Sequence, residues 1–208
     1  MKRGKFVILA FCLLVAGSIA LSSCIKENNG ETIALIGTEY YVDDILSMIP
    51  QPLIQEFESR FGSIPTGSVP DSIEGSYVVD PYTLVATNAF ELFSPIEYQN
   101  IYMRFSKQHN GIAVLELGEA TNHTTDTVYV MGKDRNFTVY GIEEKTTTLN
   151  VYVKRGIIIC GTLTDAGIDS LRMASIIKEV DGDEGLAPGY YYIYKDGNGL
   201  ADTCSWQP

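Results

Sequence analysis

The 208-residue sequence is poor in the side chains that carry most enzyme chemistry. It has only 2 histidines, His109 and His123, and both stand in expected loops. No HExxH, GxSxG, Walker A or GxGxxG pattern occurs, and no CxxC or Cys/His cluster suggests zinc. A pair of carboxylates remains able to act as acid and base, but the sequence singles out no pair. We therefore expect no enzyme, no catalytic residue and no cofactor.

Basic residues are also scarce. The chain has 15 lysines and arginines against 26 acidic residues, a formal net charge of −11. A domain with this balance repels phosphate backbones and anionic lipid head groups. Nucleic acid is therefore excluded as a partner, and surface charge will not hold the protein to a membrane.

A processing signal occupies the first 24 residues. Residues 2–5 carry three basic side chains, and residues 6–20 are apolar and uncharged. This run is shorter than the roughly 20 residues of a membrane span but suits a signal peptide. The sequence Leu21-Ser22-Ser23-Cys24 then has the form of a lipobox. We expect a signal peptide over residues 1–23, cleavage before Cys24, and acyl chains on Cys24 that anchor the protein. A secretory signal with a chance cysteine is the alternative.

Processing leaves residues 24–208, which suit a single domain. Removal of three basic residues makes the mature chain more acidic, at net −14. Residues 24–37 begin polar and read as a lipidated tether, followed by one domain over residues 38–208. No aspartate follows Cys24, which favours the outer membrane over the inner one. The sequence leaves open whether the periplasmic or the cell-surface face carries the domain.

The N-terminal part of this domain, residues 39–62, has helical periodicity. Leu53, Ile54, Phe57 and Phe61 share one helical face, and Gly62 follows as an expected C-cap. A second short amphipathic helix is expected before Pro50. Helices this short need an apolar surface to cover, which here is a barrel mouth or a sheet face.

The remainder has the period-two pattern of β-strands. Turn signals include Asn110-Gly111, Glu143–Lys145 and Arg155-Gly156. The stretch 168–178 also fits a helix, and we expect a strand there. Short strands with tight turns indicate an antiparallel meander closed as a barrel, or else a β-sandwich. The expected strands are 77–79, 83–86, 97–107, 111–119, 126–131, 136–143, 147–154, 156–162, 168–178 and 189–195.

Two cysteines and one acidic loop carry further candidate chemistry. Cys160 and Cys204 remain in the mature chain, either paired as a disulfide or as two buried free thiols. Asp181 and Asp183 lie in an acidic, glycine-rich loop that offers a weak calcium site, the alternative being a solvated turn.

Aromatic residues gather near the C-terminus. Strand alternation places Tyr190, Tyr192 and Tyr194 on one face, and Trp206 follows. Exposed in a groove, such rings stack on sugars or apolar ligands. The alternative is a packed strand or barrel wall.

Three segments resemble uncharacterised lipoproteins of gut Bacteroidetes. They are Phe57-Glu-Ser-Arg-Phe-Gly-Ser-Ile-Pro65, Pro70-Asp-Ser-Ile-Glu-Gly-Ser-Tyr-Val78 and Ile159-Cys-Gly-Thr-Leu-Thr-Asp-Ala-Gly-Ile168. The resemblance implies a lipocalin- or calycin-like β-barrel with a short helical N-terminal piece, and it implies no established activity. The Gly-x-Trp motif of true lipocalins is absent, and Gly75-Ser76-Tyr77 stands near its expected place.

Two further patterns are typical of that bacterial group. Lys26-Glu27 is a short match to the signal that sends lipoproteins to the cell surface. Ser72, Thr127 and Ser170 stand in Asp-(Ser/Thr)-aliphatic triplets, the acceptor pattern for O-glycosylation.

Two functions from different classes remain. The leading hypothesis is a lipid-anchored barrel that binds a small apolar or glycan ligand. The alternative is a non-enzymatic structural or accessory subunit of an envelope complex, with a filled core and a docked protein partner. The packing of the barrel interior distinguishes them.

Overall fold

The computed structural model describes residues 47–119, 122–147, 150–182 and 185–206. The expected signal peptide, Cys24, the expected tether and most of the expected first helix lie outside these residues. Within them, helix α2 (Gln51–Phe61) ends at Gly62. The Gly62 N–H donates to the Glu58 carbonyl at 2.8 Å, which confirms the predicted C-cap. Among these residues no helix is both long and apolar enough to cross a bilayer.

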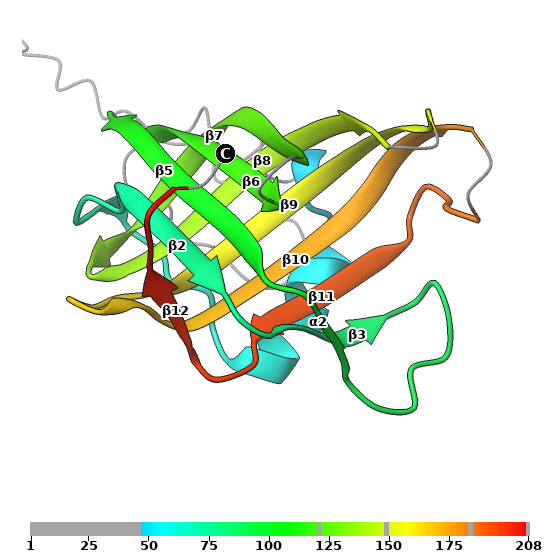
Figure 1. Cartoon of the computed structure of the whole chain (residues 1–208), viewed down its shortest axis with the longest axis horizontal. Coiled ribbons are helices and arrows are strands. Elements are labelled where there is room, and N and C mark those ends of the chain that lie inside the picture. The colour runs from blue at the N-terminus through cyan, green and yellow to red at the C-terminus, as the bar shows by residue number, and fades with distance from the viewer. Residues whose placement is uncertain (1–46, 120–121, 148–149, 183–184, 207–208) are drawn as a thin grey trace, which may run out of the picture. The chain divides into compact units, whose positions relative to one another are not determined.

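The domain is mainly β, as predicted, and its strands form one sheet (Figure 1). The twelve strands are β1 (Ser68–Pro70), β2 (Gly75–Val79), β3 (Tyr82–Thr87), β4 (Ile96–Tyr98), β5 (Ile101–His109), β6 (Ile112–Glu119), β7 (Asn122–Asp134), β8 (Asn136–Thr146), β9 (Tyr152–Leu163), β10 (Gly167–Asp181), β11 (Tyr191–Asp196) and β12 (Leu200–Thr203).

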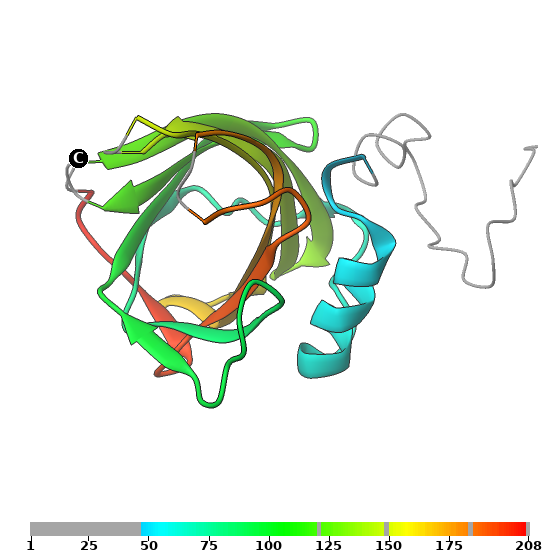
Figure 2. The ribbon, with the colours of Figure 1, turned by 90° about the vertical axis from the view of Figure 1, so that its right-hand side faces the viewer.

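The sheet is an antiparallel meander that curls into a partial ring (Figure 2). Strands β5 to β10 pair in sequence order, and only β1 pairs in parallel, with β7. The far edge of β10 pairs with β12 over Gly167–Asp169 and with β11 over Arg172–Ile176. Strand β12 also pairs with β2, and β2 pairs with β5. The pairings therefore lead from β12 back to β5, where the meander begins.

The chain's early and late strands meet at a seam. Strands β2 and β3 are interrupted at residues 80–81, and β11 and β12 are interrupted opposite them at residues 197–199. The buried Asp196 carboxylate accepts from the backbone N–H groups of Asp80, Asn198 and Gly199, at 3.0, 3.0 and 2.7 Å. The Asn198 side-chain amide donates to the Asp80 carbonyl at 2.7 Å. The side chains of Asp196 and Asn198 thus provide hydrogen-bond partners for backbone groups at both interruptions.

Two predicted turns are wrong. Arg155-Gly156 and Glu143–Lys145 lie inside β9 and β8, so residues 152–154 of one expected strand and the whole expected strand 156–162 form one strand. Gly156 serves close packing instead of a turn, because a Cβ there would overlap the carbonyl oxygen of Met48. The real β8–β9 turn is closed by the Thr147 N–H, which donates to Val151 at 2.8 Å. The Asn110-Gly111 turn is confirmed.

The ambiguous stretch 168–178 is a strand, as expected, and β10 carries its irregularity. A bulge shifts the β9–β10 register between Asp169 and Arg172, and Ser170 has a φ of 51°. The shift places Ile168 and Leu171 in the same apolar cluster although they are three residues apart. That spacing is why the segment also looks helical.

Two apolar layers follow from strand alternation. One fills the ring and takes side chains from nearly every strand, including Phe105, Phe137, Ile159 and Leu171. The other lies outside, where Leu53, Ile54 and Phe57 of α2 pack against Ile158 and neighbouring residues of β9 and β10 (Figure 2). Helix α2 therefore covers a sheet face, one of the two surfaces expected for it.

Candidate functional site

The interior of the ring has two chemically different ends. Phe105, Phe137, Ile159, Leu171 and their neighbours make the apolar end, which is filled with buried side chains. Toward the other end the same inward faces become polar and aromatic. We call this second region the polar end; its members are Tyr82, Tyr98, Thr124, Asp126, Glu143, Arg155, Ser175, Tyr192 and Tyr194.

A buried ion pair lies at the centre of the polar end. Glu143 on β8 and Arg155 on β9 are direct cross-strand partners, and an Nη2–Oε2 distance of 2.7 Å joins them. Glu143 is only 4% exposed, and the Thr124 hydroxyl donates to its other oxygen at 3.5 Å. Because both charges are compensated by each other, the pair can persist away from bulk water.

Two buried polar atoms beside this pair have no hydrogen-bond partner within the described part of the chain. They are Nε of Arg155 and Oγ of Ser175. Ser175 is 5% exposed and lies opposite Ile157 on β9, so its side chain shares the inward face with Arg155. An unsatisfied buried donor costs roughly 1–3 kcal/mol. Such atoms are uncommon in native proteins and mark a place where a water molecule or another polar group can bind.

Tyrosines of three strands form the wall next to the ion pair. The rings of Tyr82 on β3 and Tyr194 on β11 stack with centroids 4.2 Å apart, and Tyr192 stacks on Tyr194 at 6.4 Å. Tyr98 on β4 lies 6.4 Å from both Tyr82 and Tyr194 and is 45% exposed. The row therefore runs from the rim of the ring toward its interior.

The tyrosine wall and the ion pair are electrostatically coupled. Burial raises the pKa of Tyr82 and of Tyr194, and the nearby Arg155 guanidinium opposes that rise for both hydroxyls. Both rings are nonetheless partly accessible to solvent. The wall thus presents aromatic faces and neutral hydroxyl groups to whatever enters this end.

Asp126 adds a titratable group to the same inward face. Burial raises its pKa to about 6, and the charges of Glu143 and Glu144 push it in the same direction, against a hydrogen bond from Thr124. Its carboxyl therefore changes charge near neutral pH, while most carboxyls stay ionised there.

The structure brings together only part of the predicted stacking group. Tyr192 and Tyr194 stack on each other as expected, and Tyr190 and Tyr192 both pack against the apolar cluster of Val151, Val153 and Ile177. Trp206 is not part of the group. Its ring lies on the outer side of the sheet, 5.6 Å from His123 and 4.9 Å from the Arg104 guanidinium.

Several members of the site escaped sequence reasoning. The sequence pattern assigns Glu143 and Arg155 to turns and so does not predict their cross-strand pairing. The alternation of inward and outward side chains along each strand could have revealed both residues. Each lies two positions from a buried inward side chain or from a glycine that takes the place of one. Tyr82 and Tyr98 reach the wall only through the pairing of β3 with β4 and β11, which periodicity does not reveal.

Cys160 and Cys204 are not bonded to each other in the structure, and only Cys160 is buried, whereas Cys204 is partly exposed. Cys160 is fully buried in the layer beneath α2, where burial raises its pKa to about 12. Cys204 follows β12, and its N–H donates to the Ser76 carbonyl at 2.9 Å. The two thiols thus belong to different parts of the sheet.

The remaining predicted positions are exposed. Ser72, Thr127 and Ser170 all present their hydroxyls at the surface, and their glycosylation stays a prediction. Asp181 is exposed at the end of β10, while Asp183 lies outside the described residues. The described residues hold no group of three or more His, Cys, Asp or Glu side chains arranged for a metal.

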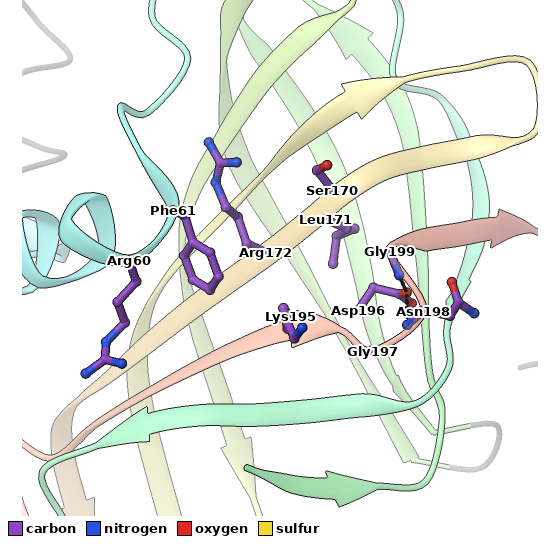
Figure 3. Close-up of a pocket in the computed structure, with 10 residues that line it drawn as sticks. All are labelled: Arg60, Phe61, Ser170, Leu171, Arg172, Lys195, Asp196, Gly197, Asn198 and Gly199. Atoms are coloured by element: carbon purple, nitrogen blue, oxygen red, sulfur yellow. Dashed lines mark hydrogen bonds between the residues drawn. The ribbon is translucent and has the colours of Figure 1, made fainter. Parts of the chain in front are cut away.

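An outer pocket of about 520 Å³ lies between the end of α2 and strands β10 and β11 (Figure 3). It is lined by Arg60, Arg172, Lys195 and Asp196 among others, but most of these charges are already engaged. Arg60 pairs with Glu56 at 2.7 Å, Arg172 donates to the Ser63 carbonyl at 3.2 Å, and Asp196 serves the seam. Arg172 Nε is also buried and without a partner in the described part of the chain, so this feature is not unique to the polar end. The polar end has two such atoms next to a buried ion pair, and we take it as the stronger candidate.

Comparison of the chain with protein-family models, with curated proteins and with solved structures finds no match. The functional argument therefore rests on the geometry of the polar end.

Proposed function

We propose that this protein is a lipid-anchored cell-envelope protein that binds a small ligand at the polar end of a lipocalin- or calycin-like barrel. The observation that carries the proposal is the pair of buried, unpartnered atoms, Arg155 Nε and Ser175 Oγ, beside a wall of stacked tyrosines. A ligand supplies the missing partners and recovers the cost of leaving them unpaired. No catalytic role is proposed.

The strand pairings support closure of the barrel. With β2–β3, β4–β5 and β11–β12 each counted as one interrupted strand, about eight strands surround the interior. A barrel of this size has room for side chains and one small ligand. In this protein the apolar end is filled, so the ligand belongs at the polar end.

The anchor and location follow from the sequence. The lipobox ending at Cys24 supports acylation, and the missing aspartate after it supports delivery to the outer membrane. Replacement of Cys24 by serine is expected to move the protein from the membrane to the soluble fraction. Continued membrane association of that variant in salt-washed fractions would contradict the proposed anchor.

Native mass spectrometry of the protein purified from its own envelope tests ligand binding. We expect a co-purifying small molecule that is lost from an Arg155→Leu, Ser175→Ala double variant. An outer-surface variant, Arg135→Leu, is the control, because Arg135 pairs only with the exposed Asp165. Ligand mass that is absent from wild type, or equally present in the double variant, would count against the proposal.

A second candidate function is that of an accessory subunit of an envelope complex. It is favoured by the apolar side chains at the β3–β4 connection, where Phe90 is 46% and Phe93 is 87% exposed. A stoichiometric protein partner in the same spectra, released by Phe93→Ser, would favour this function.

A further inference from the structure

The polar end discriminates between the two ligand classes that the proposed function leaves open, and the inference below rests on that function. An apolar ligand filling this end would leave Arg155 Nε and Ser175 Oγ, which are already shielded from water, without a partner, and would further desolvate the partly buried Asp126 carboxyl. Each desolvated group left unpaired costs roughly 1–3 kcal/mol. The favourable free energy of apolar contact with the tyrosines would be offset by the cost of these unpaired groups.

The charges on this face argue against an anionic ligand. The Arg155 cation is balanced by Glu143 at 2.7 Å. Lys145, which lies opposite the inward Val153 near the rim, is a second cation on this face, and Asp126 is a second acid there, ionised above pH 6. A ligand carboxylate or phosphate would therefore meet two acids for two cations and gain no net attraction.

Hydroxyl groups match the two unpartnered atoms, Arg155 Nε and Ser175 Oγ, and also the nearby Asp126 carboxyl. Arg155 Nε can only donate, Ser175 Oγ both donates and accepts, and an ionised Asp126 only accepts. A sugar hydroxyl is both a donor and an acceptor and can serve all three. Flat faces for sugar rings are provided by the row from Tyr98 at the rim to Tyr82 and Tyr194 inside.

We propose that the polar end binds a neutral saccharide, with a ring stacked on the tyrosine wall and hydroxyls bonded to Arg155, Ser175 and Asp126. Tyr98, being half exposed, then contacts the part of the saccharide that projects from the rim.

Two binding measurements test the ligand class. The whole mature chain, made water-soluble by Cys24→Ser, is applied to an array of neutral and acidic oligosaccharides and, separately, titrated with the apolar dye N-phenyl-1-naphthylamine. We expect retention by neutral oligosaccharides and no dye binding. Dye binding alone, or preference for acidic saccharides, overturns the saccharide proposal and leaves ligand binding intact. Binding of neither probe overturns both the saccharide proposal and the proposed function.

Matched variants locate the site. Ser175→Ala is expected to weaken binding of the retained saccharide about tenfold, the loss of roughly one hydrogen bond. Its thermal midpoint should not fall, because Ser175 Oγ has no partner in the free protein. A purely structural serine would instead lower the midpoint and leave affinity unchanged.

Tyr192→Leu is expected to weaken binding more than Tyr191→Leu does. Tyr191 is the adjacent residue on the opposite face of β11, against the layer beneath α2, and so is the control for the strand. Equal losses of affinity in the two variants would overturn the placement of the saccharide inside the ring.

Discussion

The two ends of the ring interior are built on the same strands and do opposite things. On β7, Val128 and Val130 fill the apolar end while Asp126 faces the polar end. On β9, Ile157 and Ile159 likewise fill the apolar end, while Arg155 faces the polar end. The larger apolar cluster thus occupies one half of these strands, and the other half carries polar and charged groups beside the smaller cluster of Val151, Val153 and Ile177.

The largest test of this difference is truncation of the apolar end. Phe137 is fully buried, with its ring centroid 6.2 Å from that of Phe105. Phe137→Ala is expected to lower the free energy of unfolding by about 3–5 kcal/mol because it leaves a cavity. Urea denaturation measures this. Tyr192→Ala, at the partly accessible polar end, should cost about 1 kcal/mol. Similar losses from the two variants would erase the distinction between the ends.

Breaking the ion pair should have an intermediate effect. Glu143→Gln leaves the half-buried Arg155 charge without its partner and is expected to cost about 2 kcal/mol. Adding Arg155→Gln should recover part of that loss, since the isolated charge is then gone. A double-mutant cycle from urea denaturation measures the coupling. If the two changes in the free energy of unfolding were strictly additive, the ion pair would contribute nothing to the stability of the polar end.

The smallest effect is a pH dependence at Asp126. Its folded pKa of about 6 lies above its ordinary value of 3.8, so the folded state holds the proton more tightly than the unfolded state does. Stability contributed by this group is present below pH 4 and is lost as the pH rises through 6. Asp126→Asn should therefore stabilise the protein by about 1 kcal/mol at pH 7.5, after allowance for solvent screening, and change little at pH 4.

Thermal midpoints at the two pH values measure this effect. Thr127→Asn, the exposed neighbour on the outer face, is the control and should show no such pH difference. A stabilisation by Asp126→Asn that is the same at both pH values would rule out the titration of Asp126 as its source.

Much of the fold was predictable because it depends on local patterns. The 3.6-residue period of Leu53, Ile54 and Phe57 and the period-two runs after residue 73 were enough to predict the helix and the antiparallel meander. The site was less predictable because it depends on pairing across strands. Charged residues beside a glycine, as at Arg155-Gly156, look like a turn until the neighbour that fills the glycine's space is known.

The seam between residues 75–87 and 191–203 has a consequence for the order of folding. Asp80 and Asp196 are separated by 116 residues in the chain, yet their hydrogen bond joins the two interruptions. Contacts this distant in sequence raise the contact order and slow folding, because a long loop must be ordered before they form. The meander β5–β10 can assemble from successive hairpins, but the ring cannot form until the C-terminal strands have paired. A ribosome-stalled or truncated chain ending before residue 191 would accordingly hold an unsealed sheet with two free edges, open to other strands and prone to aggregation.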